Sequence, residues 1–161
     1  MLIKIGHGID IHKLSPAIPL ILGGILIPSE LGSKGHSDGD VVIHALVDAI
    51  LGALALGDIG SFFPSNNEQF RNADSKVFLE FASEKLKEKQ YNINNIDINI
   101  ILESPKLNKH IDKMKTSLCN IMNINTHLIS IKATTTDKLG YIGLQKGLMA
   151  TASILIQKNE S

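Results

Sequence analysis

The chain has 161 residues, enough for one compact domain with a real core, and its hydrophobic fraction of 43% is ordinary for a globular protein. Lys and Arg balance Asp and Glu at 16 each, so no long-range field favours nucleic acid or an anionic membrane, and we expect neither as a partner. No segment reaches the ~18 apolar residues that a membrane span needs. The chain begins at once on strand-like sequence without a signal or transit peptide, and its single Cys119 fits a reducing compartment, so we expect a cytoplasmic protein.

The spacing of apolar residues predicts the elements of the first half of the chain. Apolar residues that alternate with polar ones indicate strands, and a period of three to four residues indicates a helix. Clusters of Gly, Pro and polar residues separate these segments. In chain order the predicted elements are a strand at 2–12, a strand at 20–27 with a turn or bulge at Gly23 and Gly24, a loop at 30–39, a helix at 40–56 ended by Gly57, and a loop at 58–64.

The same reasoning predicts the elements of the second half. In chain order they are a helix at 74–89, a strand at 93–102, a helix at 109–123, a strand at 128–133, a loop or helix start at 134–140 and a last segment at 147–156 that we predict as a strand, with a helix as the alternative. The residues predicted to face inward from the first of these helices are Val77, Phe78, Phe81, Ala82 and Leu86.

This order of elements implies an α/β fold. We expect a single domain over residues 1–161, with a mixed β-sheet and helices packed on one of its faces. One side of the predicted strand at 93–102 is apolar, whereas the other side mixes Ile with Asn and Asp. Such a mixed side suits contact between copies of the chain better than open solvent, so we infer an oligomer.

Three side chains of metal-binding type stand near the N-terminus. Asp10 and His12 occur in Gly-His-Gly-Ile-Asp-Ile-His (6–12), and His44 follows Ser-Asp-Gly-Asp at 37–40. Residues two apart on a strand face the same side, so Asp10 and His12 can converge on one ion, and a helix start can add His44. Two imidazoles and one carboxylate suit zinc with an open fourth position, the pattern of a catalytic site, although an Asp-x-His pair alone is common without metal.

Six motifs occur in order along the chain. They are Gly-His-Gly-Ile-Asp-Ile-His (6–12), Gly-His-Ser-Asp-Gly-Asp (35–40), Ala-Leu-Gly-Asp-Ile-Gly (55–60), Ala-Asp-Ser (73–75), Ser-Pro-Lys (104–106) and Lys-Ala-Thr-Thr-Thr-Asp-Lys-Leu-Gly (132–140). Over almost the whole chain they resemble the 2-C-methyl-D-erythritol 2,4-cyclodiphosphate synthase family of the non-mevalonate isoprenoid pathway. The resemblance implies an enzyme in which the 2-phosphate of 4-diphosphocytidyl-2-C-methyl-D-erythritol 2-phosphate attacks the β-phosphorus, forming the cyclic diphosphate and releasing CMP. It also implies a homotrimer whose sheets face inward and whose active sites lie at the subunit interfaces.

The resemblance further implies two divalent ions. Asp10, His12 and His44 would bind zinc, with a substrate phosphate oxygen as the fourth ligand. Asp137 stands where relatives carry Glu and would hold magnesium or manganese across the diphosphate. Because Asp is shorter than Glu, it could reach that ion through water. From spacing alone, Asp48 lies one helical turn beyond His44 and could either orient its free ring nitrogen or make no such contact.

The remaining roles come from the resemblance too. His36 and Thr135 would stabilise the transition state, Asp58 would bind the methylerythritol hydroxyls, and the segment 102–108 would hold cytidine. One subunit would supply the zinc side of each site, and its neighbour would supply 102–108 and 133–137. The implied substrate-binding residues are Asp10, His12, His36, Ser37, Asp58, Ile59, Gly60, Phe63, Asn67, Leu102, Ser104, Pro105, Lys106, Leu107, Asn108, Ala133, Thr134, Thr135, Thr136, Asp137 and Tyr141.

Besides Asp137, three departures from the family pattern matter. Asn67 replaces an Asp and loses its charge, Tyr141 replaces a Phe, and Leu144 stands where Arg is frequent in the central cavity of the trimer. Leu cannot pair with a diphosphate, so a cavity ligand is in doubt. Two other readings stay open: a non-catalytic homologue that binds cytidine nucleotide or metal, and a metal-dependent phosphodiesterase.

Overall fold

The computed structural model describes residues 2–159, so Met1 and the last two residues of the domain predicted over 1–161 lie outside the described part. The strands are β1 (Ile3–Pro16), β2 (Leu20–Leu22), β3 (Ile25–Ile27), β4 (Leu31–Lys34), β5 (Tyr91–Ile101), β6 (Ile129–Thr134) and β7 (Gly147–Lys158). The helices are α1 (Val41–Ala53), α2 (Ile59–Phe62), α3 (Lys76–Glu88), α4 (Ile111–Met122) and α5 (Gly140–Gly143), with the 3-10 turns η1 (Glu68–Phe70) and η2 (Thr126–Leu128).

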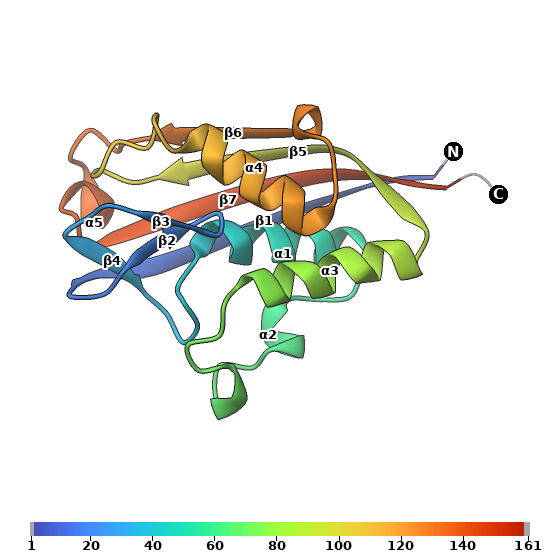
Figure 1. Cartoon of the computed structure of the whole chain (residues 1–161), viewed down its shortest axis with the longest axis horizontal. Coiled ribbons are helices and arrows are strands. Elements are labelled where there is room, and N and C mark those ends of the chain that lie inside the picture. Colours follow the sequence, from blue (N-terminus) through green and yellow to red (C-terminus); the bar gives the residue numbers. More distant parts are fainter. Residues whose placement is uncertain (1, 160–161) are drawn as a thin grey trace.

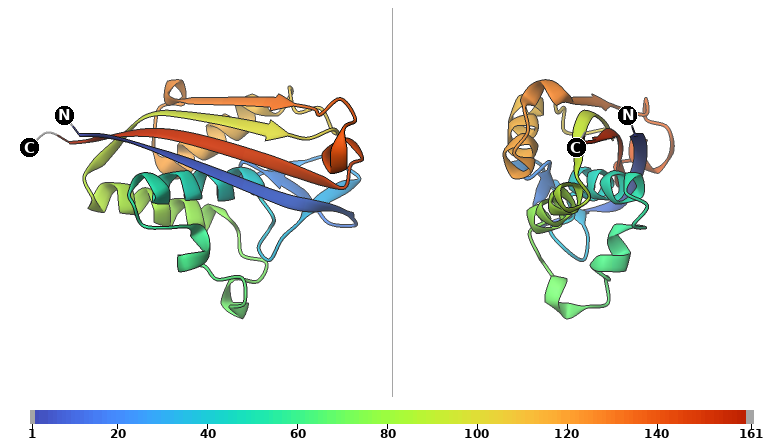
Figure 2. Two further views of the ribbon diagram at one scale, coloured as in Figure 1. Left: turned by 180° about the vertical axis from the view of Figure 1, so that it is seen from behind. Right: turned by 90° about the vertical axis from the view of Figure 1, so that its right-hand side faces the viewer.

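The fold is a mixed sheet covered by helices, as the element order predicts. Five strands pair in the order β4-β1-β7-β5-β6, and only β5 and β6 run parallel (Figure 1). The three long helices α1, α3 and α4 lie on one face of this sheet (Figure 2), with α1 across β1 and β7. Their apolar stripes and the inward side of the sheet form one continuous core.

The first strand, β1, has two chemically different faces. Its even-numbered residues at 6–12 face the helices and comprise two glycines, Asp and His. Its odd-numbered residues face away from them, and Ile5, Ile9 and Ile11 have exposed fractions of 77%, 49% and 50%. The apolar side of this strand therefore lies on the uncovered face of the sheet, while its polar side lies beneath α1.

Asp40 fixes the start of α1. Its carboxylate is fully buried and accepts bonds from the amides of Val42 and Ile43 at the helix start and from those of Gly23 and Gly24 in the β2–β3 turn. Burial raises the pKa of Asp40 to about 6, although these amides act in the opposite direction. One side chain thus attaches the hairpin to the first turn of α1 and sets where that turn begins.

Most predicted elements are confirmed. The strand predicted at 20–27 is a hairpin whose turn is Gly23 and Gly24, both with positive φ. The segments at 93–102, 128–133 and 147–156 form β5, β6 and β7, and the last of these is a strand rather than the alternative helix. The helices predicted at 74–89 and 109–123 are α3 and α4.

Some predicted boundaries are wrong. The loop predicted at 30–39 contains β4, which pairs with an extension of β1 to Pro16, and pairing partners distant in sequence cannot be read from local composition. Helix α1 ends at Ala53, and the first residue with left-handed φ after it is Ala55 rather than Gly57. Val77 is 52% exposed instead of inward, because the side of the first turn of α3 that faces the core carries Phe78 and Leu79.

The short elements were predicted only in part. The loop predicted at 58–64 contains the single turn α2. Of the loop or helix start predicted at 134–140, the structure has the loop, and the single turn α5 begins at its last residue, Gly140. Helices this short lack the several turns from which a period of 3.6 can be recognised. Within residues 2–159, no helix has the length and apolar character needed to cross a membrane.

Candidate active site

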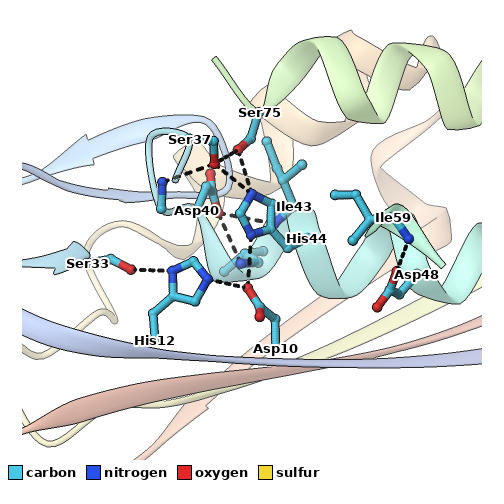
Figure 3. A network of polar contacts seen from close by, with 12 residues as sticks. Asp10, His12, Ser33, Ser37, Asp40, Ile43, His44, Asp48, Ile59 and Ser75 are labelled. Carbon is cyan, nitrogen blue, oxygen red and sulfur yellow. Dashed lines mark hydrogen bonds and ion pairs between the residues drawn. The ribbon is translucent and has the colours of Figure 1, made fainter. Parts of the chain in front are cut away.

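Asp10, His12 and His44 converge beneath the start of α1 (Figure 3). Oδ2 of Asp10 lies 3.1 Å from Nε2 of His12 and 3.0 Å from Nδ1 of His44, and all three donor atoms lie within 4.8 Å of one another. Ligand atoms of a tetrahedral zinc ion lie about 3.3 Å apart, given bond lengths of about 2.0–2.2 Å. The predicted grouping is therefore confirmed, and its donor set and spacing fit one divalent ion.

Asp10 and the two histidines also shift one another's pKa values. Burial favours a higher pKa for Asp10, but hydrogen bonds and charge from His12 and His44 outweigh it and hold that pKa well below its usual range. Burial favours a lower pKa for His44, but the bond and charge of Asp10 outweigh it and raise that pKa. Asp10 is thus ionised, as a metal ligand must be.

Hydroxyl groups surround the two imidazoles. Nδ1 of His12 lies 3.1 Å from Oγ of Ser33, and Nε2 of His44 lies 2.9 Å from Oγ of Ser75 and 3.0 Å from Oγ of Ser37. In both rings the nitrogen turned away from Asp10 therefore has a polar partner, as is usual for histidines that bind metal. Sequence reasoning missed Ser33 and Ser75, although Ser75 ends the motif at 73–75.

Asp48 does not orient His44. Its Oδ1 instead accepts a bond of 2.7 Å from the amide of Ile59 at the start of α2 (Figure 3). Partial burial raises the pKa of Asp48, although this amide acts in the opposite direction. Of the two alternatives drawn from helical spacing, the one in which Asp48 orients His44 is wrong, and the one without that contact is confirmed. The carboxylate bonds instead to α2, which the sequence did not predict.

The metal-type group opens into the histidine hollow, a cavity of about 260 Å³. It brings together many of the predicted site residues, and aromatic side chains form part of its wall. Its lining comprises Asp10, His12, His36, Ser37, His44, Ile59, Gly60, Phe63, Ser65, Phe70 and Phe78. Phe70 and Phe78 were not predicted as lining residues, and their rings lie 5.2 Å and 4.5 Å from that of Phe63.

His36 and Asn67 meet at the rim of this hollow. Nε2 of His36 lies 3.1 Å from the main-chain oxygen of Asn67, and a carbonyl only accepts, so Nε2 carries a proton. The side-chain oxygen of Asn67 accepts from the amide of Gln69. Asn67 therefore acts on His36 through its backbone, and its side chain caps the turn η1.

Asp58 begins α2. Its Oδ1 accepts from the amide and the hydroxyl of Ser61, at 2.9 Å and 2.7 Å, and these bonds lower its pKa. Within residues 2–159 no donor is bonded to its Oδ2. Asp58 is a helix cap with one carboxylate oxygen open to solvent.

A second cavity, the β5–β6 hollow of about 320 Å³, lies at the carboxyl ends of the two parallel strands. It gathers most of the residues that the resemblance assigns to cytidine. Its lining comprises Leu102, Glu103, Pro105, Lys106, Leu107, Asn108, Ala133, Thr134 and Thr135. Among these Glu103 was not predicted, and its carboxylate lies 3.3 Å from the amide of Thr136.

Six predicted residues lie outside both linings: Asp58, Asn67, Ser104, Thr136, Asp137 and Tyr141. The hydroxyl of Thr136 donates to the carbonyl of Leu139, which fixes the loop after β6. Asp137 is exposed, has a left-handed φ of 52°, and its amide lies 3.4 Å from the hydroxyl of Thr135. The two hollows have no lining residue in common.

Comparisons with known proteins agree with this geometry. The model of the YgbB family matches residues 3–157. The chain is 52% identical over 159 residues to 2-C-methyl-D-erythritol 2,4-cyclodiphosphate synthase of Francisella tularensis subsp. novicida, covering 98% of this chain and 100% of the relative. It is 46% identical over 158 residues to the enzyme of the same name from Mannheimia succiniciproducens, covering 98% and 99%.

Solved structures agree as well. The bifunctional IspDF from Campylobacter jejuni matches with a TM-score of 0.95 and 39% identity over 99% of this chain, which spans 43% of that longer protein. The CDP complex of IspF from Plasmodium falciparum matches with a TM-score of 0.86 and 39% identity, over 98% of this chain and 97% of that one. On the family match, the full-length identity and the metal-type group, the chain belongs to the YgbB family of 2-C-methyl-D-erythritol 2,4-cyclodiphosphate synthases.

Proposed function

We propose that the two hollows hold the two ends of one substrate, 4-diphosphocytidyl-2-C-methyl-D-erythritol 2-phosphate, which this enzyme converts to the cyclic diphosphate and CMP. A 2-phosphate oxygen forms a bond to the β-phosphorus, and the bond from that phosphorus to the oxygen shared with CMP breaks. The observation that carries this proposal is the metal-type group in one hollow and the separate nucleotide-sized hollow at 102–108. The CDP complex of the Plasmodium falciparum protein supports a cytidine nucleotide as ligand.

In this proposal the histidine hollow binds the methylerythritol 2-phosphate. Ser37 contacts the phosphate, and His36, whose Nε2 is held by a carbonyl, turns its other ring nitrogen toward the reacting groups. Asp58 accepts methylerythritol hydroxyls through Oδ2, while its Oδ1 remains on Ser61. The aromatic wall excludes water around the attacking group, which strengthens each polar contact.

Zinc is the ion proposed for Asp10, His12 and His44, and magnesium or manganese the ion proposed for Asp137. Bound there, the ions would neutralise phosphate charge and act as Lewis acids. The chain itself places Oδ2 of Asp10 3.1 Å from Nε2 of His12 and 3.0 Å from Nδ1 of His44, in a cavity lined by protein. Asp137 has a left-handed backbone, and its amide lies 3.4 Å from the hydroxyl of Thr135, which lines the β5–β6 hollow.

The β5–β6 hollow is proposed to bind cytidine and the leaving CMP. Backbone groups at 102–108 would surround the base, Lys106 would meet the CMP phosphate, and Thr135 would stabilise the transition state. The carboxyl ends of parallel strands are where α/β proteins commonly bind ligands. Apart from Asp137, the groups proposed to hold the phosphates on this side of the site are hydroxyls, amides and Lys.

We further propose a homotrimer, acting in the cytoplasm as one domain over residues 1–161. The uncovered sheet face bears Ile5, Ile9 and Ile11, an apolar surface that suits burial against other copies. The two hollows have no lining residue in common, which supports a site completed by two subunits. In that arrangement the histidine hollow of one subunit faces the β5–β6 hollow of its neighbour.

Mixed oligomers test the divided site. His44→Ala disables the histidine hollow and Thr135→Ala the β5–β6 hollow, so each variant alone is expected to be inactive. Co-assembled in equal amounts, they should recover about a quarter of the wild-type rate, because random pairing unites two intact halves at one interface in four. Mixing His44→Ala with Asp10→Ala, which disables the same half, should recover nothing, and equal recovery in both mixtures would contradict the proposal.

A second test concerns Leu144, which is 65% exposed at the end of α5. In the proposed trimer three copies line the axis, where relatives often have Arg. An isoprenoid diphosphate on the axis would lack its charged partners, each worth roughly 1.5–3 kcal/mol. Native mass spectrometry should therefore find no such ligand in the purified protein and should find one in Leu144→Arg, with turnover kept in both. A ligand in the unmodified protein, with no gain in the variant, would overturn this expectation.

The reaction itself is tested by the fate of the substrate. Phosphorus NMR should show equal amounts of cyclic diphosphate and CMP. CMP with a linear product would instead identify a phosphodiesterase. Binding of CDP without any turnover, at saturating zinc and magnesium, would identify a non-catalytic homologue.

A further inference from the structure

We propose that Asp38 and Ser75 form a positioning pair that keeps the ring proton of His44 on Nε2 and so reserves Nδ1 for the metal. This inference rests on the metal site of the proposed function. It concerns two residues that neither the motifs nor the comparisons assign a role. The pair links the loop at 36–40 to the start of α3 and ends on the metal-type group.

The contacts form one continuous chain. Oγ of Ser75 lies 2.5 Å from Oδ1 of Asp38. The same oxygen lies 2.9 Å from Nε2 of His44, whose Nδ1 faces Asp10 at 3.0 Å (Figure 3). The amide of Ser75 also donates to Oδ2 of Asp38, at 3.0 Å. Ser75 is fully buried, so water does not compete for its hydroxyl. Both ends of the Asp38 carboxylate are thus occupied by one residue.

The direction of each hydrogen bond follows from what the groups can donate. An ionised carboxylate has no proton to give, so the Ser75 hydroxyl donates to Asp38. Its oxygen can then only accept toward His44, and this requires a proton on Nε2. A metal bound at Nδ1 leaves the bond from Nε2 to Ser75 in place.

The other hydroxyls near the imidazoles lack this enforced direction. Ser37 lies 3.0 Å from Nε2 of His44, and its further partners among the described residues are the amide of Gly39 and the hydroxyl of Ser75, both at 3.4 Å. Ser33 beside His12 has no carboxylate bonded to it within residues 2–159. Either hydroxyl can donate or accept, so Ser75 alone is fixed as an acceptor.

The main test measures Zn²⁺ affinity of purified, metal-free protein by competition with a chelating dye. Ser75→Ala should weaken binding roughly 10- to 100-fold, the usual effect of losing such a partner. Asp38→Asn should weaken Zn²⁺ binding at least as much. The Asn amide group can donate to Ser75, whose hydroxyl could then donate toward His44 instead of accepting from it. Ser37→Ala should change affinity less than about threefold, because Ser75 remains.

Asp74→Asn is the matched control. It removes one carboxylate charge directly beside Ser75, but Asp74 is exposed and bonds only the amide and side chain of Lys76. Its Zn²⁺ affinity should stay near that of the wild type, which separates the hydrogen-bond effect from net charge. If Asp38→Asn does not fold, Ser75→Ala decides the question, because it keeps the backbone bond to Asp38.

A second readout is independent of affinity. In Co²⁺-loaded protein, proton NMR should show a shifted, slowly exchanging signal from the ring N–H at Nε2 of His44. Ser75→Ala should speed its exchange with solvent, whereas Asp74→Asn should leave it unchanged. Wild-type affinity and unchanged exchange in Ser75→Ala would overturn the proposal for the pair alone, whereas a wild-type protein that binds no Zn²⁺ would overturn the proposed metal site as well.

Discussion

Replacing His44 with Ala should abolish stoichiometric zinc binding and reduce cyclisation by about three orders of magnitude or more. The substitution removes one of three donors and leaves Asp10 and His12, too few to hold the ion tightly. Loss of an ion that stabilises transition-state charge costs several kcal/mol, and about 4 kcal/mol corresponds to a thousandfold in rate. Zinc is measured by elemental analysis and cyclisation by phosphorus NMR.

The fold of this variant should persist, because His44 lies at the rim of a cavity rather than inside the apolar core. His127→Ala is the matched control: His127 is exposed in η2, and its loss should alter neither zinc content nor rate. Full zinc content and activity in His44→Ala would mean that the site is misassigned.

Gly8→Ala should destabilise the protein by about 3 kcal/mol, because extra volume at a tight contact forces the backbone apart. A Cβ at Gly8 would overlap the carbonyl oxygen of Ala45 in α1 and would lie 2.8 Å from the amide nitrogen of Ala49. Both are backbone atoms of a helix that cannot yield locally. The free energy of unfolding is obtained from urea titration of the metal-free protein.

Gly52→Ala provides a control on the same helix. A Cβ at Gly52 has no atom within 4 Å, and its backbone needs no left-handed φ, so Ala should stabilise α1 by about 0.4–1 kcal/mol. The two Gly→Ala changes therefore have opposite expected signs. A shift below about 0.5 kcal/mol for Gly8→Ala would contradict the close packing of α1 on β1.

Long elements with a clear period could be predicted from the sequence. Helices α3 and α4 and the three strands β5, β6 and β7 carry enough apolar residues to establish a period of 3.6 or 2. Strand β4 could not be predicted from the sequence, because its four residues gain their conformation by pairing with β1 rather than from their own propensity. The single turn α2 likewise depends on its cap Asp58 and on the bond between Ile59 and Asp48.

The candidate site, too, could be predicted from the sequence only in part. The group of Asp10, His12 and His44 follows from strand alternation and a helix start, and the structure brings those side chains together. The Asp48 hypothesis failed because its true partner, the amide of Ile59, is reached only through a tertiary contact. No local pattern distinguishes Ser75 from other serines at helix starts. Its bond to His44 depends on the position of α3 in the fold and could not be predicted from the sequence.

The two faces of β1 make its length a constraint on evolution. A single inserted or deleted residue between the N-terminus of the strand and Asp10 would exchange the faces of every residue on one side of the change. Isoleucines would then point at α1 where glycines now allow it to approach, or the metal-type side chains would turn to the uncovered face. We therefore expect insertions and deletions in related sequences to lie outside 6–12, in the turn after Pro16. The alternation of inward and outward residues along β1 should be kept.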